Sequence, residues 1–223
     1  RMPAARRALL RSPLALLTLA AVLGARCGGA DAGAACSDPF TPIPQIQGPG
    51  PSAAIQGLVT TLGVVIADFE GPGPNLRGFY LQDPGGDGDP ATSDGIFVFH
   101  GDNDLVSIGQ GVRVTGTASE FQGQTQIAAE SVLDCGAAAP PEPVDVTLPF
   151  PDDAALERLE GMLVRLPQTL VVTDTWRLGR FGEVTLAAGD RLRAPTEVAA
   201  PGAEALAVAE RNRRHRILLD DAR

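Results

Sequence analysis

A glycine-rich segment in the first half of the chain carries the densest group of potential metal ligands. Residues 83–95 have the sequence Asp-Pro-Gly-Gly-Asp-Gly-Asp-Pro-Ala-Thr-Ser-Asp-Gly, with carboxylates at Asp83, Asp87, Asp89 and Asp94. Four carboxylates on one loop can converge on Ca²⁺, which takes six or more oxygen ligands. The spacing differs from that of the helix-loop-helix calcium motif, and Asp-Gly pairs also mark ordinary turns. We therefore expect either a calcium site or a plain solvated loop.

Aromatic residues flank this loop on two segments with strand character. Strict alternation places Tyr80 and Phe97 on the face opposite the one that fills the core. An exposed aromatic ring can stack on a nucleic-acid base, and arginines beside it, here Arg77 and Arg113, can contact phosphates. These four residues are the candidate nucleic-acid-binding set. The alternative is that both rings pack against the second half of the chain.

A basic cluster, Arg-Asn-Arg-Arg-His-Arg, occupies residues 211–216. Phosphate contact is one interpretation of these cations. The other is structural, because a helix C-terminus favours cations and Glu210 can pair with Arg213 or Arg214 on the next turn.

The sequence offers no familiar catalytic constellation. The chain has two histidines, His100 and His215, and no Ser-His-Asp or Cys-His arrangement can be assembled from its motifs. Zinc-ligand spacing, a phosphate-binding loop and a dinucleotide fingerprint are also missing. We nominate no catalytic residue.

The elements that must position these residues are mainly β-strands. Apolar, β-branched segments separated by Gly, Pro and Asp clusters predict five strands, at residues 55–69, 77–82, 95–100, 111–119 and 123–132. A long first strand with glycines at its bends favours a small five-stranded barrel like the oligonucleotide/oligosaccharide-binding (OB) fold over residues 55–135. Residues 101–110 offer only a turn where that fold usually has a helix.

The flanking regions differ in character from the barrel. Residues 35–54 are a proline-rich lead-in without expected regular structure, and residues 136–143 form a linker. Residues 144–223 predict a smaller α+β or OB-like block, with helices at 151–160 and 203–214 and strands at 144–148, 162–166, 169–173, 183–186 and 217–219. Because the pattern stops abruptly, we expect this block to be incomplete.

The first residues, 1–34, have the arginines, apolar run and small residues of an export signal, and the run is too short to span a bilayer stably. A lipoprotein signal ending at Cys27 is the rival interpretation. Removing residues 1–34 leaves 13 arginines against 26 acids, a net charge of −13 compared with −9 for the whole chain. This charge argues against binding nucleic acid by bulk electrostatics. An exported protein with cysteines at Cys36 and Cys135, on either side of the barrel, predicts a disulfide between them.

Six ordered segments together resemble a known family. They are GFYLQDPGGDGDPATSDGIFVF, GVRVTGTASEFQGQTQI, LEGMLVRLP, VTDTWRLGRFGEVTL, APTEV and RILLDD. Over residues 36–223 they resemble the N-terminal region of bacterial secreted endonucleases, in which OB-type domains precede a catalytic domain of the endonuclease/exonuclease/phosphatase superfamily. The resemblance implies a nuclease parent whose metal-dependent phosphodiesterase centre, with its divalent metal, lies in a downstream domain that this sequence does not contain.

The resulting hypothesis is a secreted accessory region that binds or positions single-stranded or nonspecific nucleic acid for that catalytic domain. We expect an extracellular location, with periplasmic or cell-surface retention as variants, and no membrane span. The alternative is a non-enzymatic extracellular module that binds a sugar or another protein.

Overall fold

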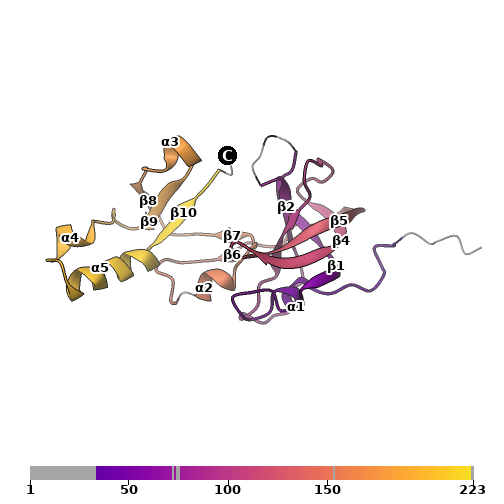
Figure 1. The fold of residues 1–223 in the computed structure, drawn as a ribbon, viewed down its shortest axis with the longest axis horizontal. Coiled ribbons are helices and arrows are strands. Elements are labelled where there is room, and N and C mark those ends of the chain that lie inside the picture. The colour runs from indigo at the N-terminus through magenta and orange to yellow at the C-terminus, as the bar shows by residue number, and fades with distance from the viewer. Residues whose placement is uncertain (1–33, 72, 74–75, 153, 222–223) are drawn as a thin grey trace, which may run out of the picture. The chain divides into compact units, whose positions relative to one another are not determined.

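The computed structural model describes residues 34–71, 73, 76–152 and 154–221 (Figure 1). The predicted export signal therefore lies outside the described residues, apart from its last residue, Ala34. The fold is mainly β, with a five-stranded mixed sheet, two smaller sheets and a few helices. No helix among the described residues is long and apolar enough to cross a membrane.

The large sheet contains the five strands expected from the sequence. They are β1 (Gly57–Phe69), β2 (Gly78–Gln82), β3 (Gly95–Phe99), β4 (Gln110–Phe121) and β5 (Gln124–Ala137). Their order is β1-β2-β3-β5-β4, and only β3 and β5 run parallel. Since β1 also pairs with β4, the sheet returns to its first strand. The predicted linker at 136–143 begins too early, because β5 continues to Ala137.

The length of β1 allows it to belong to two ladders. Its first half pairs with β4 and its second half with β2, and Val64 has a partner in both. A side chain at Gly63 would place its Cβ 2.8 Å from the carbonyl oxygen of Gln82, so only glycine permits this approach of the strands. A register shift between Val65 and Ala67 follows, as expected where a strand bends.

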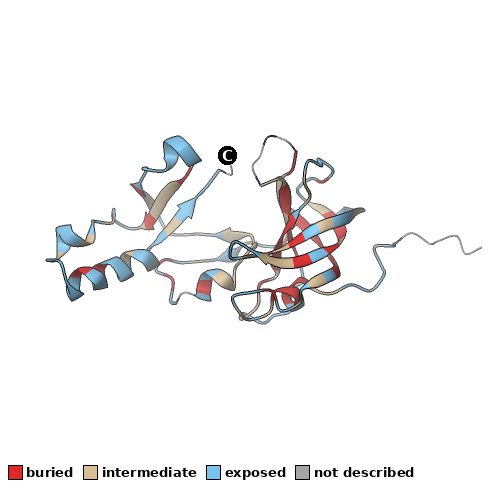
Figure 2. Cartoon of the chain, viewed as in Figure 1, coloured by how far each residue is buried: buried red, intermediate tan, exposed pale blue. Residues whose placement is uncertain are grey.

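The core of this sheet contains the residues on the predicted inner face of β2 and β3, although Phe97 on the opposite face is buried as well. Phe79, Leu81, Ile96 and Val98 are fully buried and belong to one hydrophobic cluster. Buried residues concentrate in the β1–β5 sheet, whereas much of the chain from β8 onward is exposed (Figure 2).

The proline-rich lead-in is more ordered than predicted. It contains a short helix, α1 (Ile43–Gln47), whose first residues follow Pro42. Ile43 and Ile46 are fully buried in the same cluster as the strands. The prediction of an irregular segment was wrong because two prolines at the start of a helix are tolerated where no backbone N–H is needed.

The predicted disulfide between Cys36 and Cys135 is confirmed, with Cα atoms 5.8 Å apart. It joins the lead-in to β5 across a sequence separation of 99 residues. In the chain-entropy account, closing a loop of this length stabilises the fold by roughly 4 to 5 kcal/mol.

The second block has two small sheets and four helices among its described residues. The elements are β6 (Val144–Asp145), α2 (Ala154–Glu157), β7 (Val164–Arg165), β8 (Leu170–Asp174), α3 (Leu178–Phe181), β9 (Val184–Ala188), α4 (Pro195–Val198), α5 (Ala203–Arg214) and β10 (Arg216–Leu219). The parallel pair β6–β7 is separate from the antiparallel sheet of order β10-β9-β8. The predicted helix at 203–214 matches α5, whereas the one at 151–160 shortens to α2. Helices α3 and α4 were not predicted.

Candidate nucleic-acid interface

The aromatic pair predicted to stack on bases lies on the outer face of β2 and β3, but it is not open. Tyr80 and Phe97 are cross-strand partners with ring centroids 5.1 Å apart. Phe97 is only 4% exposed, and the hydroxyl of half-buried Tyr80 accepts a hydrogen bond of 3.1 Å from Gln124 Nε2. Burial leaves Phe97 no free ring face for a base, so any stacking on this face depends on Tyr80.

The two arginines of the predicted set are already engaged. Arg113 is buried, and its guanidinium donates hydrogen bonds of 2.7 Å to the carbonyl oxygens of Asp38 and Pro39. Arg77 Nη2 lies 2.7 Å from Asp102 Oδ1, with its guanidinium over the ring of Phe99. Arg113 therefore anchors the lead-in to the sheet, and Arg77 is the more accessible cation of the two.

The carboxylates of the 83–94 loop mainly accept hydrogen bonds from their own loop. Asp83 Oδ1 accepts from the backbone N–H of Gly85, Asp87 Oδ1 from that of Asp89, and Asp89 Oδ1 from that of Ala91. Burial, with further repulsion from Asp87 and Asp83, raises the pKa of Asp94 against a hydrogen bond from the Asp87 backbone. Within the described ranges, no group of three or more His, Cys, Asp or Glu side chains is arranged to hold a metal ion. Calcium binding by Asp83, Asp87, Asp89 and Asp94 stays a prediction.

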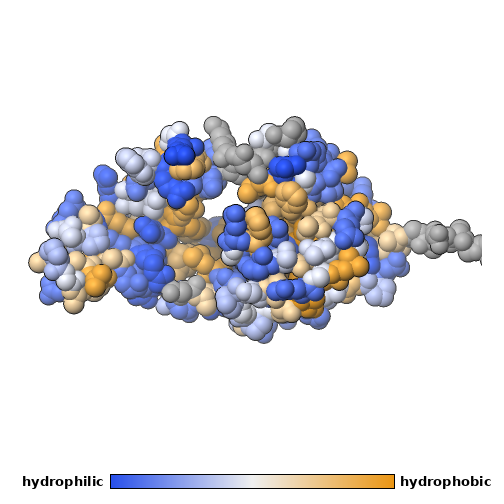
Figure 3. Space-filling view, viewed as in Figure 1, coloured by the Kyte–Doolittle hydropathy of each residue, from blue (hydrophilic) through white to orange (hydrophobic). Residues whose placement is uncertain are grey.

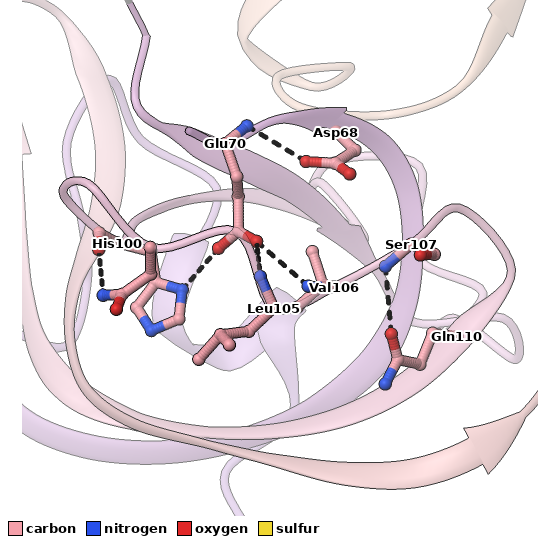
Figure 4. A network of polar contacts seen from close by, with 8 residues as sticks. Asp68, Glu70, His100, Leu105, Val106, Ser107 and Gln110 are labelled. Atoms are coloured by element: carbon pink, nitrogen blue, oxygen red, sulfur yellow. Dashed lines mark hydrogen bonds and ion pairs between the residues drawn. The ribbon is translucent and has the colours of Figure 1, made fainter. Parts of the chain in front are cut away.

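A buried His-Glu pair holds the chain that follows β3 against the end of β1 (Figure 4). His100 Nδ1 contacts Glu70 Oε1, while Glu70 Oε2 accepts hydrogen bonds of 2.6 Å and 3.0 Å from the backbone N–H groups of Leu105 and Val106. Burial raises the pKa of Glu70, but the hydrogen bonds from His100, Val106 and Leu105 outweigh it, so the net pKa is lowered. The sequence analysis did not nominate Glu70, since it stands 30 positions from His100.

Three further carboxylates influence one another's ionisation: Glu120 on β4, Glu157 on α2 and Glu160 just after α2. Glu160 Oε1 accepts a hydrogen bond of 2.7 Å from the backbone N–H of Thr125. Burial, together with repulsion from Glu157 and Glu120, raises the pKa of Glu160 to about 7. Glu160 thus titrates near neutral pH, although no sequence motif distinguishes it from the other acids.

An open groove of about 640 Å³ lies between the acidic loop and the start of the second block. Its apolar lining includes Val146, Phe150 and Leu159, and Asp89 and Asp94 line its loop side. Hydrogen bonds from Ser93 Oγ to the carbonyl oxygen of Glu160 and from Leu163 N–H to Gln82 Oε1 hold the two sides together. The groove is large enough for a small ligand.

The basic cluster at 211–216 spans the end of α5 and the start of β10. Glu210 pairs with Arg213 at 2.8 Å and with Arg214 at 3.8 Å, which confirms the structural pairing expected from helical spacing. Arg216 and Arg211 are exposed. The cluster therefore combines paired cations with accessible ones.

Compared with protein-family models and with curated proteins, the chain gives no match.

Proposed function

We propose that this chain is the accessory region of a secreted nuclease, which binds or positions nucleic acid for a phosphodiesterase domain outside this sequence. The observation that carries the proposal is the arrangement of β1–β5. Five strands in the order β1-β2-β3-β5-β4, with β1 returning to β4, are typical of a Greek-key barrel of the OB type. We infer that the β1–β5 sheet is such a barrel. The six-segment resemblance to secreted endonucleases supports the same class.

The disulfide adds support for an exported protein. Disulfides persist in oxidising compartments and are rare in the cytosol, so the Cys36–Cys135 bridge is compatible with an extracellular location. Catalysis is assigned to the downstream domain, where the resemblance implies a divalent metal.

A binding titration tests this function. The purified full chain is titrated with a labelled single-stranded oligonucleotide at low salt, with and without millimolar calcium. Binding in the micromolar range that weakens with salt supports the proposal, because phosphate contacts release counterions. Binding no tighter than about millimolar, with and without calcium, rules out direct recognition.

The groove beside the acidic loop supports the alternative of a sugar- or protein-binding module. Its apolar lining and flanking carboxylates suit a small neutral ligand better than a polyanion. Saturable binding of an oligosaccharide, lost on replacing a groove residue such as Leu159, together with no oligonucleotide binding, would make this alternative the leading one.

A further inference from the structure

The arginines of this chain are distributed very unevenly. Residues 34–143 contain two arginines and thirteen acids, whereas residues 144–223 contain eleven arginines and thirteen acids. Eight of those eleven lie between residues 177 and 216, a segment that contains α3, β9, α4, α5 and the first residue of β10. A polyanion approaching the chain is therefore repelled by the β1–β5 sheet and meets its highest density of cations on the segment from α3 to the start of β10.

Two adjoining hollows over this sheet are lined by arginine. One, of about 280 Å³, includes Arg191, Arg193 and Arg216, and the other, of about 370 Å³, includes Arg177, Arg213 and Arg216. Asp174, Thr185 and Arg216 line both hollows, so the two adjoin at these residues. We call the surface formed by Arg191, Arg193 and Arg216 the arginine trough. Hydrophilic side chains gather around the C-terminal half of α5, beside β10 (Figure 3).

Hydrogen bonds join the loop after β9, which carries Arg191 and Arg193, to β8 and to α5. Leu192 N–H donates to Thr173 Oγ1 at 2.9 Å, which fixes the loop after β9 against β8. Asn212 Nδ2 donates to the carbonyl oxygen of Arg193 at 2.9 Å, which ties the same loop to α5. The arginine side chains thus project from a backbone that is already positioned, and this lowers the entropic cost of binding.

The trough arginines are also available. Arg191, Arg193 and Arg216 are exposed, and Arg191 Nε donates one hydrogen bond of 3.3 Å to the carbonyl oxygen of Thr173. Within the part of the chain that the structure describes, no carboxylate forms a salt bridge with any of them. Arg177, in contrast, forms a salt bridge of 2.7 Å with Glu183 and contributes less free charge. Asp174, which lines both hollows, sets an upper limit on the attraction of the trough for phosphate.

An exposed aromatic residue lies two positions after Asp174, which lines both hollows. Trp176 is the only tryptophan of the chain and is 89% exposed, although large aromatic side chains usually bury most of their surface. Its backbone N–H donates to Asp174 Oδ1 at 2.8 Å, which ties the Trp176 backbone to a residue that lines both hollows. A base can stack on this free ring while its phosphates lie along arginines, which is the usual combination in single-strand binding.

We propose that the arginine trough and Trp176, and not the outer face of β2 and β3, form the contact surface for single-stranded nucleic acid. The inference rests on the proposed function and names its site. A single strand fits better than a duplex, because stacking on Trp176 needs an unpaired base. The interaction is sequence-tolerant, since neither ring stacking nor phosphate contact selects a particular base.

The sole tryptophan provides a direct measurement. The full chain is titrated with an oligothymidylate and with an abasic oligonucleotide of equal length, and both Trp176 fluorescence and ligand anisotropy are recorded. We expect both ligands to bind and only the oligothymidylate to quench Trp176. Equal quenching by the abasic strand, or by heparin, would overturn the stacking arrangement. Trp176→Ala should weaken oligothymidylate binding by about tenfold while leaving abasic binding unchanged.

Charge variants locate the phosphate contacts. The salt dependence of binding is the slope of log K against log salt. Replacing Arg191, Arg193 and Arg216 together by Gln should reduce the magnitude of this slope by about 2. Each single variant should lower it by about 0.7, which keeps the test decisive if the triple variant loses its fold. Arg165→Gln is the control, because Arg165 is exposed, is paired with Asp145 and lies on β7 outside the trough.

The outcomes separate the site from the function. If the wild-type chain binds, the trough variants bind equally well and Tyr80→Ala or Arg77→Gln abolishes binding, the site assignment is wrong and the proposed function stands. If the wild-type chain binds no oligonucleotide at low salt, the proposed function fails as well. Loss of binding in the trough variants alone, with unchanged melting temperature, supports the site.

Discussion

At the scale of single residues, the most tightly held polar group is the Glu70 carboxylate. Its side chain is fully buried and accepts hydrogen bonds from two backbone N–H groups while it contacts His100. We therefore interpret the pair as a clamp that fixes residues 100–106 to the end of β1.

Replacing Glu70 by Gln tests this clamp. Because the folded-state pKa of Glu70 is lowered, its stabilisation is present above the ordinary pKa of 4.5 and is lost as the pH falls through the folded-state value. We expect Glu70→Gln to reduce the free energy of unfolding by about 2 kcal/mol at pH 7, and the difference to shrink in acid. Urea unfolding of both proteins between pH 3 and pH 7 measures this.

The control for Glu70 is Asp102→Asn, in the same segment. Asp102 is 73% exposed in its surface pair with Arg77, so its loss should change the free energy of unfolding by about 0.5 kcal/mol or less. A destabilisation by Glu70→Gln that stays constant down to pH 3 would show that the carboxylate charge is not what stabilises the segment.

For Glu160 we expect the opposite dependence of stability on pH. Its pKa is raised from 4.5 to about 7, so the folded state binds an extra proton in that range and stability falls as the pH rises through it. Glu160→Gln imitates the protonated form and still accepts the Thr125 N–H. At pH 8 we expect this variant to be more stable than the wild type by roughly 1 kcal/mol, a value reduced for solvent screening.

Thermal melts from pH 4.5 to pH 8 decide the Glu160 prediction. The wild-type melting temperature should decline across this range more steeply than that of Glu160→Gln. Glu130→Gln, an exposed acid on β5, should follow the wild type. Parallel pH profiles for wild type and Glu160→Gln would mean that neither burial nor the Glu157 and Glu120 charges raise the pKa of Glu160 in the folded state.

At the scale of elements, the lead-in behaves as part of the large sheet. Ile46 is fully buried in its core, so Ile46→Ala should cost about 2 to 5 kcal/mol by removing packed methyl groups and leaving a cavity. Leu58→Ala, on β1 but 70% exposed, should change stability by about 0.5 kcal/mol or less. Chemical denaturation of the two variants compares them, and equal small effects would mean that α1 is not packed in solution.

Several elements could be predicted from local patterns alone. The period-2 alternation of Phe79, Leu81, Ile96 and Val98 assigned the buried face of β2 and β3 correctly. The helix at 203–214 followed from its composition and matches α5. Such patterns work because the local periodicity already reflects which side faces the core.

Other features depend on contacts between distant residues and could not be predicted. Helix α1 was not predicted, because its prolines locally disfavour regular structure. The helix is stabilised by the burial of Ile43 and Ile46, which depends on the rest of the fold. Glu70 contacts a histidine 30 positions away, and the pKa of Glu160 depends on Glu120 as well as its near neighbour Glu157. For Trp176 a signal existed, since a lone Trp beside Arg177 in a turn-rich segment is unusual, but the sequence did not reveal its exposure.

At the scale of the whole molecule, charge separates the two halves of the chain. The half containing the β1–β5 sheet is strongly acidic, whereas the half with the β8–β10 sheet has nearly balanced charges with accessible arginines. A protein with a net charge of −13 after removal of residues 1–34 can still bind nucleic acid if its cations are concentrated on one surface. The overall charge then limits affinity without excluding binding.

Calcium distinguishes this arrangement from one in which cations bridge the acidic loop to phosphates. If the arginine trough carries the contact, millimolar calcium should weaken oligonucleotide binding, because calcium competes with arginine for phosphate. The double variant Asp87→Asn with Asp89→Asn should respond in the same way as the wild type. Anisotropy titrations of both proteins at constant ionic strength, with and without calcium, measure the effect. Tighter binding in calcium for the wild type only, together with a calcium-dependent rise in its melting temperature, would instead establish the predicted calcium site and make the acidic loop part of the interface.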